Sequence, residues 1–252
     1  MLLTMKYEVI RNKMTIIILC SILGATEAVF LLGLASDSKN LIGTGILGLV
    51  LGTSIIYFAI WLLGIMSFSR DLRDKTGYMV FLTPVNPYKI IVAKMLVGLL
   101  ELIAAAILFI LLAAIDIEIL FNKFGHESSV FEAIAKILGS STDTIWAGIV
   151  AFVISLVFSV LLYYSLAYFV SAVSALMSKS SGMQRFLTIL FIVLFMIFFA
   201  MIEKQMPVLK NNISDESFKK LVENIPNYLL SLCFTGVFTF GCGYLMDNKL
   251  SL

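Results

Sequence analysis

Charged residues occur in short segments along this chain, and these segments separate six long runs of apolar residues. An α-helix needs about 20 apolar residues to cross a ~30 Å hydrocarbon core. The pattern therefore predicts an all-α polytopic membrane protein, with a single transmembrane domain over residues 1–252. The six predicted transmembrane helices cover roughly residues 14–35, 42–68, 88–115, 145–177, 186–202 and 227–246.

The first 13 residues, MLLTMKYEVIRNK, combine mostly apolar side chains with charged ones. Such a segment is typical of an amphipathic helix at the membrane interface, with its basic residues toward lipid headgroups. The apolar run that follows resembles a secretory signal peptide. However, it continues for about 22 residues, which is long enough to span a bilayer. We therefore expect an N-terminal interfacial helix followed by a retained first span.

Composition excludes several classes of protein. The chain is 60% hydrophobic and 13% charged, with a mean hydropathy of +1.03, whereas soluble domains are about 45–50% apolar and about 25% charged. A net charge of +2 does not favour nucleic acid as a partner. The three cysteines lie inside apolar runs, which excludes a disulfide framework and metal-ligand spacing. The sequence also lacks the nucleotide-binding pattern G-x-x-x-x-G-K-[ST]. We expect a non-catalytic chain without a metal or cofactor of its own.

Charge asymmetry predicts the orientation in the membrane. Six spans place both termini on one side, which carries 11 Lys and Arg against four Asp and Glu. The opposite segments carry seven basic against ten acidic residues. Positively charged loops stay on the cytoplasmic side. Both termini and the polar segment between the second and third spans are therefore predicted to be cytoplasmic.

That polar segment, residues 69–94, is called the charged segment below. It begins with five charges in six residues and contains two prolines, Pro84 and Pro87. Asn86 and Pro87 match the N-cap and first position of a helix. We expect a short amphipathic helix, which could receive a push from a partner on the same side, and then a stiff connection to the third span. The five charged residues are Arg70, Asp71, Arg73, Asp74 and Lys75.

Two carboxylates, Glu27 and Glu101, lie inside predicted spans, and Glu101 falls near mid-bilayer. No basic residue lies well inside a span to pair with either. Ionisable groups at this depth mark substrate or proton pathways, while a protonated Glu hydrogen-bonded to a neighbouring helix is the structural alternative. We expect Glu101 to face a dimer interior or a wet cavity and not lipid.

Small and polar residues mark two further helix faces. Ser155, Ser159 and Tyr163 recur at helical spacing in the fourth span, where they could line a substrate route or hold helices together. Gly48 and Gly52 form a G-x-x-x-G step in the second span, which favours close helix packing.

The charged segment carries the pattern D-x-x-x-K-T-G-Y-x-x-x-L-T-P-V-x-x-x-K-x-x-x-x-K. With six spans and a basic amphipathic start, the chain resembles the permease subunits of exporter-type ABC transporters, the type 2 ABC permease family. The matching positions are Asp71, Lys75, Thr76, Gly77, Tyr78, Leu82, Thr83, Pro84, Val85, Lys89 and Lys94.

The resemblance implies that the charged segment carries a coupling helix, which docks on a separate P-loop ATPase. The implied contact residues are Arg70, Asp71, Arg73, Asp74, Lys75, Thr76, Gly77, Tyr78, Thr83 and Pro84. Two ATPase subunits, which bind ATP and magnesium, would join two permeases, either two copies of this chain or this chain and a related one. It further implies a bacterial plasma membrane protein that exports amphipathic peptides, toxins or antimicrobials by alternating access. The family often has apolar re-entrant helices between the last two spans. Residues 203–226 are polar here and predict a short helix capped by Ser214.

Two alternatives remain open. A stand-alone secondary transporter would use Glu27 and Glu101 as ion-coupling groups and would contain an inverted repeat, of which the sequence has no clear sign. A ligand-sequestering immunity or sensor protein would need no ATPase contact. The charge density of the charged segment favours the ATP-driven exporter over both.

The predicted orientation can be tested by cysteine labelling. With the three native cysteines replaced, single cysteines at Ser128 and Ser214 should react with an impermeant thiol reagent added to intact cells, because both segments are predicted to be external. A cysteine at Thr76 should react only after the membrane is opened. Labelling of Thr76→Cys in intact cells would contradict the orientation.

Overall fold

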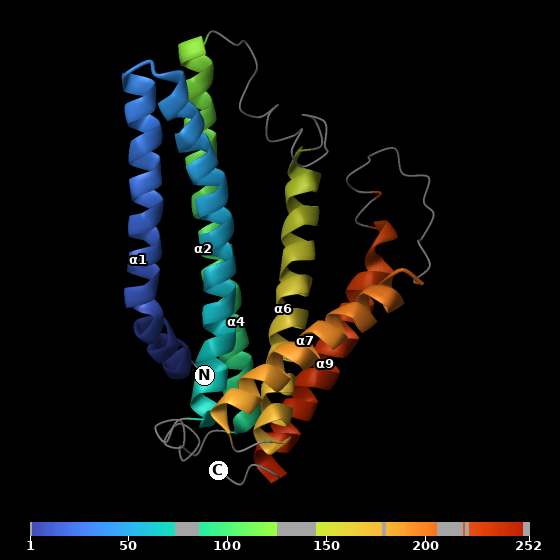
Figure 1. The fold of residues 1–252 in the computed structure, drawn as a ribbon. Helices are drawn as coiled ribbons and strands as arrows, with labels where there is room; N and C mark the ends of the chain where they lie inside the picture. Colours follow the sequence, from blue (N-terminus) through green and yellow to red (C-terminus); the bar gives the residue numbers. More distant parts are fainter. Residues whose placement is uncertain are drawn as a thin grey trace. The chain divides into compact units, whose positions relative to one another are not determined.

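The computed structural model describes residues 2–73, 86–124, 145–177, 180–205, 219 and 222–248, and the regular structure within these ranges is helical. It contains six long helices (Figure 1). Their bounds are α1 Leu2–Ala35, α2 Lys39–Arg73, α4 Pro87–Phe124, α6 Ile145–Met177, α7 Ser181–Glu203 and α9 Ile225–Asn248.

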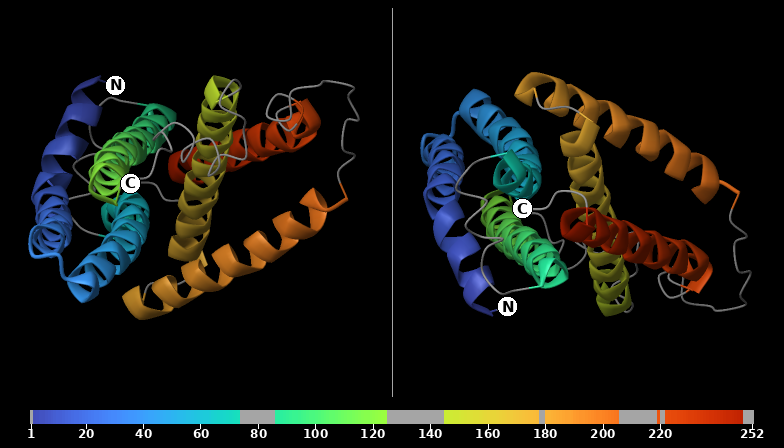
Figure 2. Two further views of the ribbon diagram at one scale, coloured as in Figure 1. Left: turned by 90° about the horizontal axis from the view of Figure 1, so that it is seen from above. Right: turned by 90° about the horizontal axis from the view of Figure 1, so that it is seen from below.

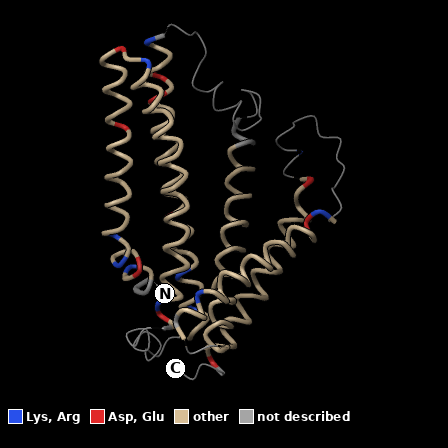
Figure 3. Tube along the Cα trace, viewed as in Figure 1, with Lys and Arg blue, Asp and Glu red and all other residues tan. Residues whose placement is uncertain are grey.

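Each of the six helices contains a stretch long and apolar enough to cross a membrane. Charged residues gather mainly near the ends of the helices, and their middles are almost free of charge (Figure 3). The described residues confirm the predicted all-α fold and supply six helices that are long and apolar enough to span a membrane, as a multi-pass membrane protein requires.

Several helices extend beyond the predicted spans. Residues 2–13 are continuous with the first span in α1. The first turns of this helix lie at an angle to the rest (Figure 1). The position of residues 2–13 at the membrane interface stays a prediction. Residues 69–73 belong to α2, so Arg70 and Asp71 lie on its last turns and not in a separate helix. Residues 116–124, expected in a polar loop, continue α4. Helix formation continues through charged residues because backbone hydrogen bonding does not require an apolar surface. Ser214 and more than half of the helix predicted to follow it lie outside the described residues.

The start of α4 matches its prediction. Asn86 accepts a hydrogen bond from the Tyr88 backbone N–H through Oδ1 at 3.0 Å, and the helix begins at Pro87. Proline at the first helical position has no N–H to leave unsatisfied, and its fixed φ suits the helix. The charged segment therefore ends in a capped, conformationally restricted helix start.

The chain divides into two compact units. Unit 1 comprises Met1–Phe68 and Val92–Phe109, and unit 2 comprises Ser69–Ile91 and Ile110–Leu252. In unit 1, α1, α2 and the middle of α4 lie side by side (Figure 2). In unit 2, α6 packs against both α7 and α9. The prediction of a single transmembrane domain stays a prediction.

Close packing in unit 1 depends on two glycines at the α1–α2 hairpin. A Cβ at Gly45 would lie 2.6 Å from Phe30 Cα, and one at Gly33 would lie 2.7 Å from the Ile42 backbone nitrogen. Both distances are too short for a side chain, so the two backbones approach through these glycines. Gly48 and Gly52 also face α1, but a Cβ at either would make ordinary contact with Thr26. The predicted packing face is present, and its closest approach lies one turn earlier.

Unit 2 is held together largely by apolar and aromatic side chains. Leu162, Leu166 and Val170 of α6 form a buried cluster with Phe238 of α9. The Phe169 and Phe238 rings stack with centroids 5.5 Å apart. Such pairs contribute roughly 0.5–1.5 kcal/mol beyond their buried area.

We predict that Gly45→Ala destabilises the protein whereas Gly43→Ala does not. A Cβ at Gly43 would have no atom within 4 Å, so alanine there should be neutral or slightly stabilising through its helix propensity. At Gly45 the backbone of α1 must move, which costs roughly 1–3 kcal/mol in close-packed sites. Thermal unfolding of both variants in the same detergent tests this. Equal midpoints would contradict the proposed close approach.

Candidate functional site

A buried polar network joins α1, α2 and α4 within unit 1. The Glu8 carboxylate accepts hydrogen bonds from Lys94 Nζ, from the Arg11 guanidinium at 2.5 Å and from Ser67 Oγ at 3.0 Å. Glu8 is 7% exposed, and Lys94 and Ser67 are each 3% exposed. Three cationic or hydroxyl donors on three helices thus converge on one carboxylate.

The Ser67 hydroxyl connects the charged groups to one another. It donates to Glu8 and accepts from Arg11 and from Lys94, the latter at 3.3 Å. A hydroxyl has one donor and two acceptor lone pairs, so all of its hydrogen-bonding capacity is used. A buried ion pair is favourable only when further hydrogen bonds satisfy its remaining polar groups, and Ser67 supplies these bonds.

The network lies at both ends of the charged segment. Ser67 precedes residue 69 by two positions, and Lys94 is the last residue of the segment. Because both bind Glu8, the residue two positions before the segment and the last residue of the segment are held on the N-terminal part of α1.

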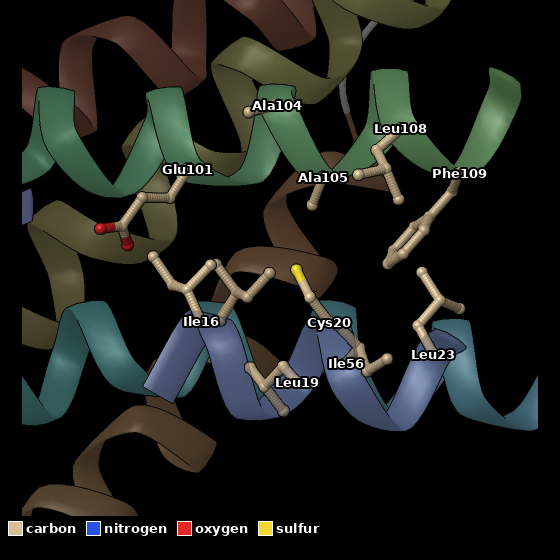
Figure 4. A pocket seen from close by; sticks show the side chains of 11 residues that line it. Ile16, Leu19, Cys20, Leu23, Ile56, Glu101, Ala104, Ala105, Leu108 and Phe109 are labelled. Carbon is tan, nitrogen blue, oxygen red and sulfur yellow. The ribbon is translucent and has the colours of Figure 1, made fainter. Parts of the chain in front are cut away.

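A second feature of unit 1 is a cavity of about 190 Å³ between α1, α2 and α4. Of its eleven lining residues, Glu101 alone is charged, and the others are apolar or cysteine. Figure 4 shows Glu101 and Ile16 near one end of the cavity, Phe109 and Leu23 near the other, and Cys20 between them.

Asn12 links the cavity to the network on α1. Its side-chain Nδ2 donates to the Glu101 carboxylate, at 3.1 Å from Oε1 and 3.4 Å from Oε2. Asn12 is buried and lies one helical turn after Glu8. The same face of α1 therefore presents one carboxylate to Lys94 and one amide to Glu101.

The predicted ATPase-coupling residues are only partly covered by the structure. Arg70 is exposed and Asp71 is buried near the end of α2, and Arg73 is the last residue of that helix. The remaining predicted residues lie outside the described part of the chain: Asp74, Lys75, Thr76, Gly77, Tyr78, Thr83 and Pro84.

The predicted route residues fall into both units. Glu27 in α1 and Glu101 in α4 are half-buried and belong to unit 1. In unit 2, the Ser155 hydroxyl lies 2.7 Å from the Tyr228 hydroxyl. Ser159 donates to the Ser155 backbone carbonyl at 2.8 Å, and Tyr163 is half-buried. These contacts within and between helices are those expected of polar groups that stabilise packing.

Sequence reasoning missed the network, although a signal was present. Glu8 and Asn12 are four residues apart, and Lys94 and Glu101 are seven apart. Both spacings place the pair on one face of a helix. One polar pair on a single face of each helix would have indicated that these two faces pack against each other.

The chemistry available to this site is ion pairing, hydrogen bonding and apolar contact. Within the described ranges, no group of three or more His, Cys, Asp and Glu side chains could hold a metal ion. No protein-family model, curated protein or solved structure matches this chain.

We predict that Lys94→Met destabilises the protein by roughly 3–5 kcal/mol, the cost of leaving one member of a buried ion pair without its partner. Lys89→Met is the matched control, because Lys89 is exposed on the same helix. The double variant Glu8→Gln, Lys94→Met should lose less than the sum of the two single variants. Chemical or thermal unfolding in detergent is measured for the parent, the two single variants, the double variant and the Lys89→Met control. Strictly additive losses would show that the two side chains do not interact.

Proposed function

We propose that this chain is the membrane subunit of an ATP-driven exporter whose ATPase is a separate protein. The observation that carries the proposal is that Glu8 bonds to the residue just before the charged segment and to the last residue of the segment. Ser67 and Lys94 make these bonds from α2 and α4. A segment that receives a push must be joined firmly to the helices it moves, and this network supplies such a joint.

The connection from the charged segment into α4 is also stiff. Asn86 caps the helix and Pro87 opens it, which restricts the backbone at the point where the chain enters the span. A stiff connection transmits displacement, whereas a flexible one absorbs it. Lys94 lies two turns further along and ties the same helix to Glu8.

The charged segment has the chemistry of a docking surface. Five charges fall within residues 70–75, and Arg70 is exposed in this chain. Complementary charges contribute specificity and association rate at interfaces more than bulk affinity. A cytoplasmic ATPase with a groove of complementary charge is the partner that fits a segment predicted to lie on the cytoplasmic side.

In the proposed assembly, two ATPase subunits bind ATP and magnesium, and two permeases form the pore in a bacterial plasma membrane. Closure of the ATPases on ATP moves the charged segments and shifts the permeases between inward-open and outward-open states. This shift requires that ATP bind the two states with different free energy. The exported substrates are proposed to be amphipathic peptides or toxins.

One observation favours a second function, a stand-alone secondary transporter. Glu101 lines a cavity, as an ion- or proton-coupling carboxylate in a span does. Transport by that mechanism would follow the ion gradient and persist without ATP. Dependence on ATP therefore separates the two functions.

We predict that an ATPase subunit co-purifies with this chain from its native membranes and that Arg70→Glu combined with Lys75→Glu disrupts the assembly. The co-purifying chain should contain G-x-x-x-x-G-K-[ST], and the eluate should hydrolyse ATP. Exposed single ion pairs contribute only ~0–1 kcal/mol, so the double charge reversal is required. Mass spectrometry and ATP hydrolysis of the eluate are the measurements.

Lys39→Glu serves as the matched control. Lys39 is exposed and starts α2 at the opposite end from Arg70, on the side predicted to be external. This variant should retain the ATPase. Full retention of the ATPase and of ATP hydrolysis by the Arg70→Glu, Lys75→Glu variant would contradict the proposed coupling role.

A further inference from the structure

The two carboxylates of the unit 1 site, Glu8 and Glu101, differ in the number and charge of their hydrogen-bond donors. Glu8 is bonded to Lys94, Arg11 and Ser67. Glu101 is bonded to the Asn12 amide alone among the side chains that the structure describes. Both nearby cations thus bind Glu8, and Glu101 is left with a neutral donor.

An amide cannot satisfy an ionised carboxylate in this position. A carboxylate has about four lone-pair sites, and Asn12 reaches Glu101 with one nitrogen. An isolated charge away from water is costly unless a charge of opposite sign pairs with it. Glu101 therefore retains acceptor capacity that suits a cationic donor.

The cavity defines the rest of the ligand. Ten of its eleven lining residues are apolar or cysteine, so the part of the ligand that fills it must be apolar. Its volume of about 190 Å³ can be compared with an engineered apolar cavity of about 150 Å³ that binds benzene. One aromatic ring or a short alkyl chain fits this space.

We propose that the cavity binds a small organic ammonium ion, with the ammonium group at Glu101 and its ring or chain between Cys20, Ile56 and Phe109. The ammonium group donates hydrogen bonds to the carboxylate, and Asn12 holds the carboxylate in position from the opposite helix. The site does not depend on the energy source of transport. In an exporter it would recognise the cationic, apolar part of the transported molecule.

Cys20 provides a reporter inside the site, because its side chain lines the cavity and is accessible. In a Cys233→Ser, Cys242→Ala background it is the sole cysteine. Purified protein is treated with methyl methanethiosulfonate, and the rate of Cys20 modification is followed by intact mass. Three probes that share a phenethyl group are compared: phenethylammonium, the neutral phenethyl alcohol and the anionic 3-phenylpropionate.

Phenethylammonium should slow the modification of Cys20 in a saturable manner, at concentrations about tenfold or more below those needed for phenethyl alcohol, because the ammonium group forms an ion pair with the carboxylate and the neutral alcohol does not. 3-Phenylpropionate should not protect. Glu101→Gln should bring the ammonium and the alcohol to equal protection. Glu118→Gln, which changes an exposed carboxylate of α4 outside the cavity lining, should leave the tenfold preference intact.

A second variant keeps the test independent of the Glu101 substitution. Phenethylammonium should also raise the thermal unfolding midpoint of the parent protein. Ala105→Leu reduces the cavity volume and leaves the carboxylate unchanged, so this rise should be absent in the variant. Equal protection by the ammonium and the alcohol in the parent protein would overturn the proposal in favour of an apolar pocket for lipid chains. Absence of protection by every probe would overturn it as well. Neither measurement uses ATP, so failure here is distinct from failure of the proposed coupling.

Discussion

The buried ion pair between Glu8 and Lys94 is the interaction on which the rest of unit 1 depends. Each charge, removed from water, requires the other, and the hydroxyl of Ser67 satisfies the hydrogen bonds that the pair leaves open. The pair joins α1 to α4, and Ser67 joins both to α2. Displacing any of the three helices at this level would expose an unpaired charge to an apolar surrounding. This constraint explains why an N-terminal segment rich in charge lies against spanning helices.

Glu8 and Glu101, two carboxylates of unit 1, differ in the donors that reach them. Glu8 has two cations and a hydroxyl, so its capacity is used within the chain. Glu101 has one amide and faces a cavity. A site that binds a ligand needs polar groups that are held in position but not fully satisfied. Glu101 meets both conditions, since Asn12 orients it from α1.

The two units achieve close helix packing by different means. In unit 1, Gly33 and Gly45 let the backbones of α1 and α2 approach without intervening side chains. In unit 2, Phe169 and Phe238 fill the space between α6 and α9. Glycine contacts permit close approach of the backbones but bury little apolar area. In unit 1 the polar network therefore helps to hold the helices together, as the aromatic side chains do in unit 2.

The sequence alone determined the six helices, because apolar runs of spanning length have few other stable states in lipid. It also determined the start of α4 at Asn86 and Pro87, since capping depends on adjacent residues only. It identified Glu101 as a carboxylate inside a span, but not what surrounds it. The partnership of Glu8 with Lys94 joins residues 86 positions apart, and the composition of either helix does not specify which face meets which. Only the tertiary structure decided that pairing. A buried charge is stable only beside a partner of opposite sign, and whether Lys94 lies beside Glu8 depends on how α1, α2 and α4 pack together.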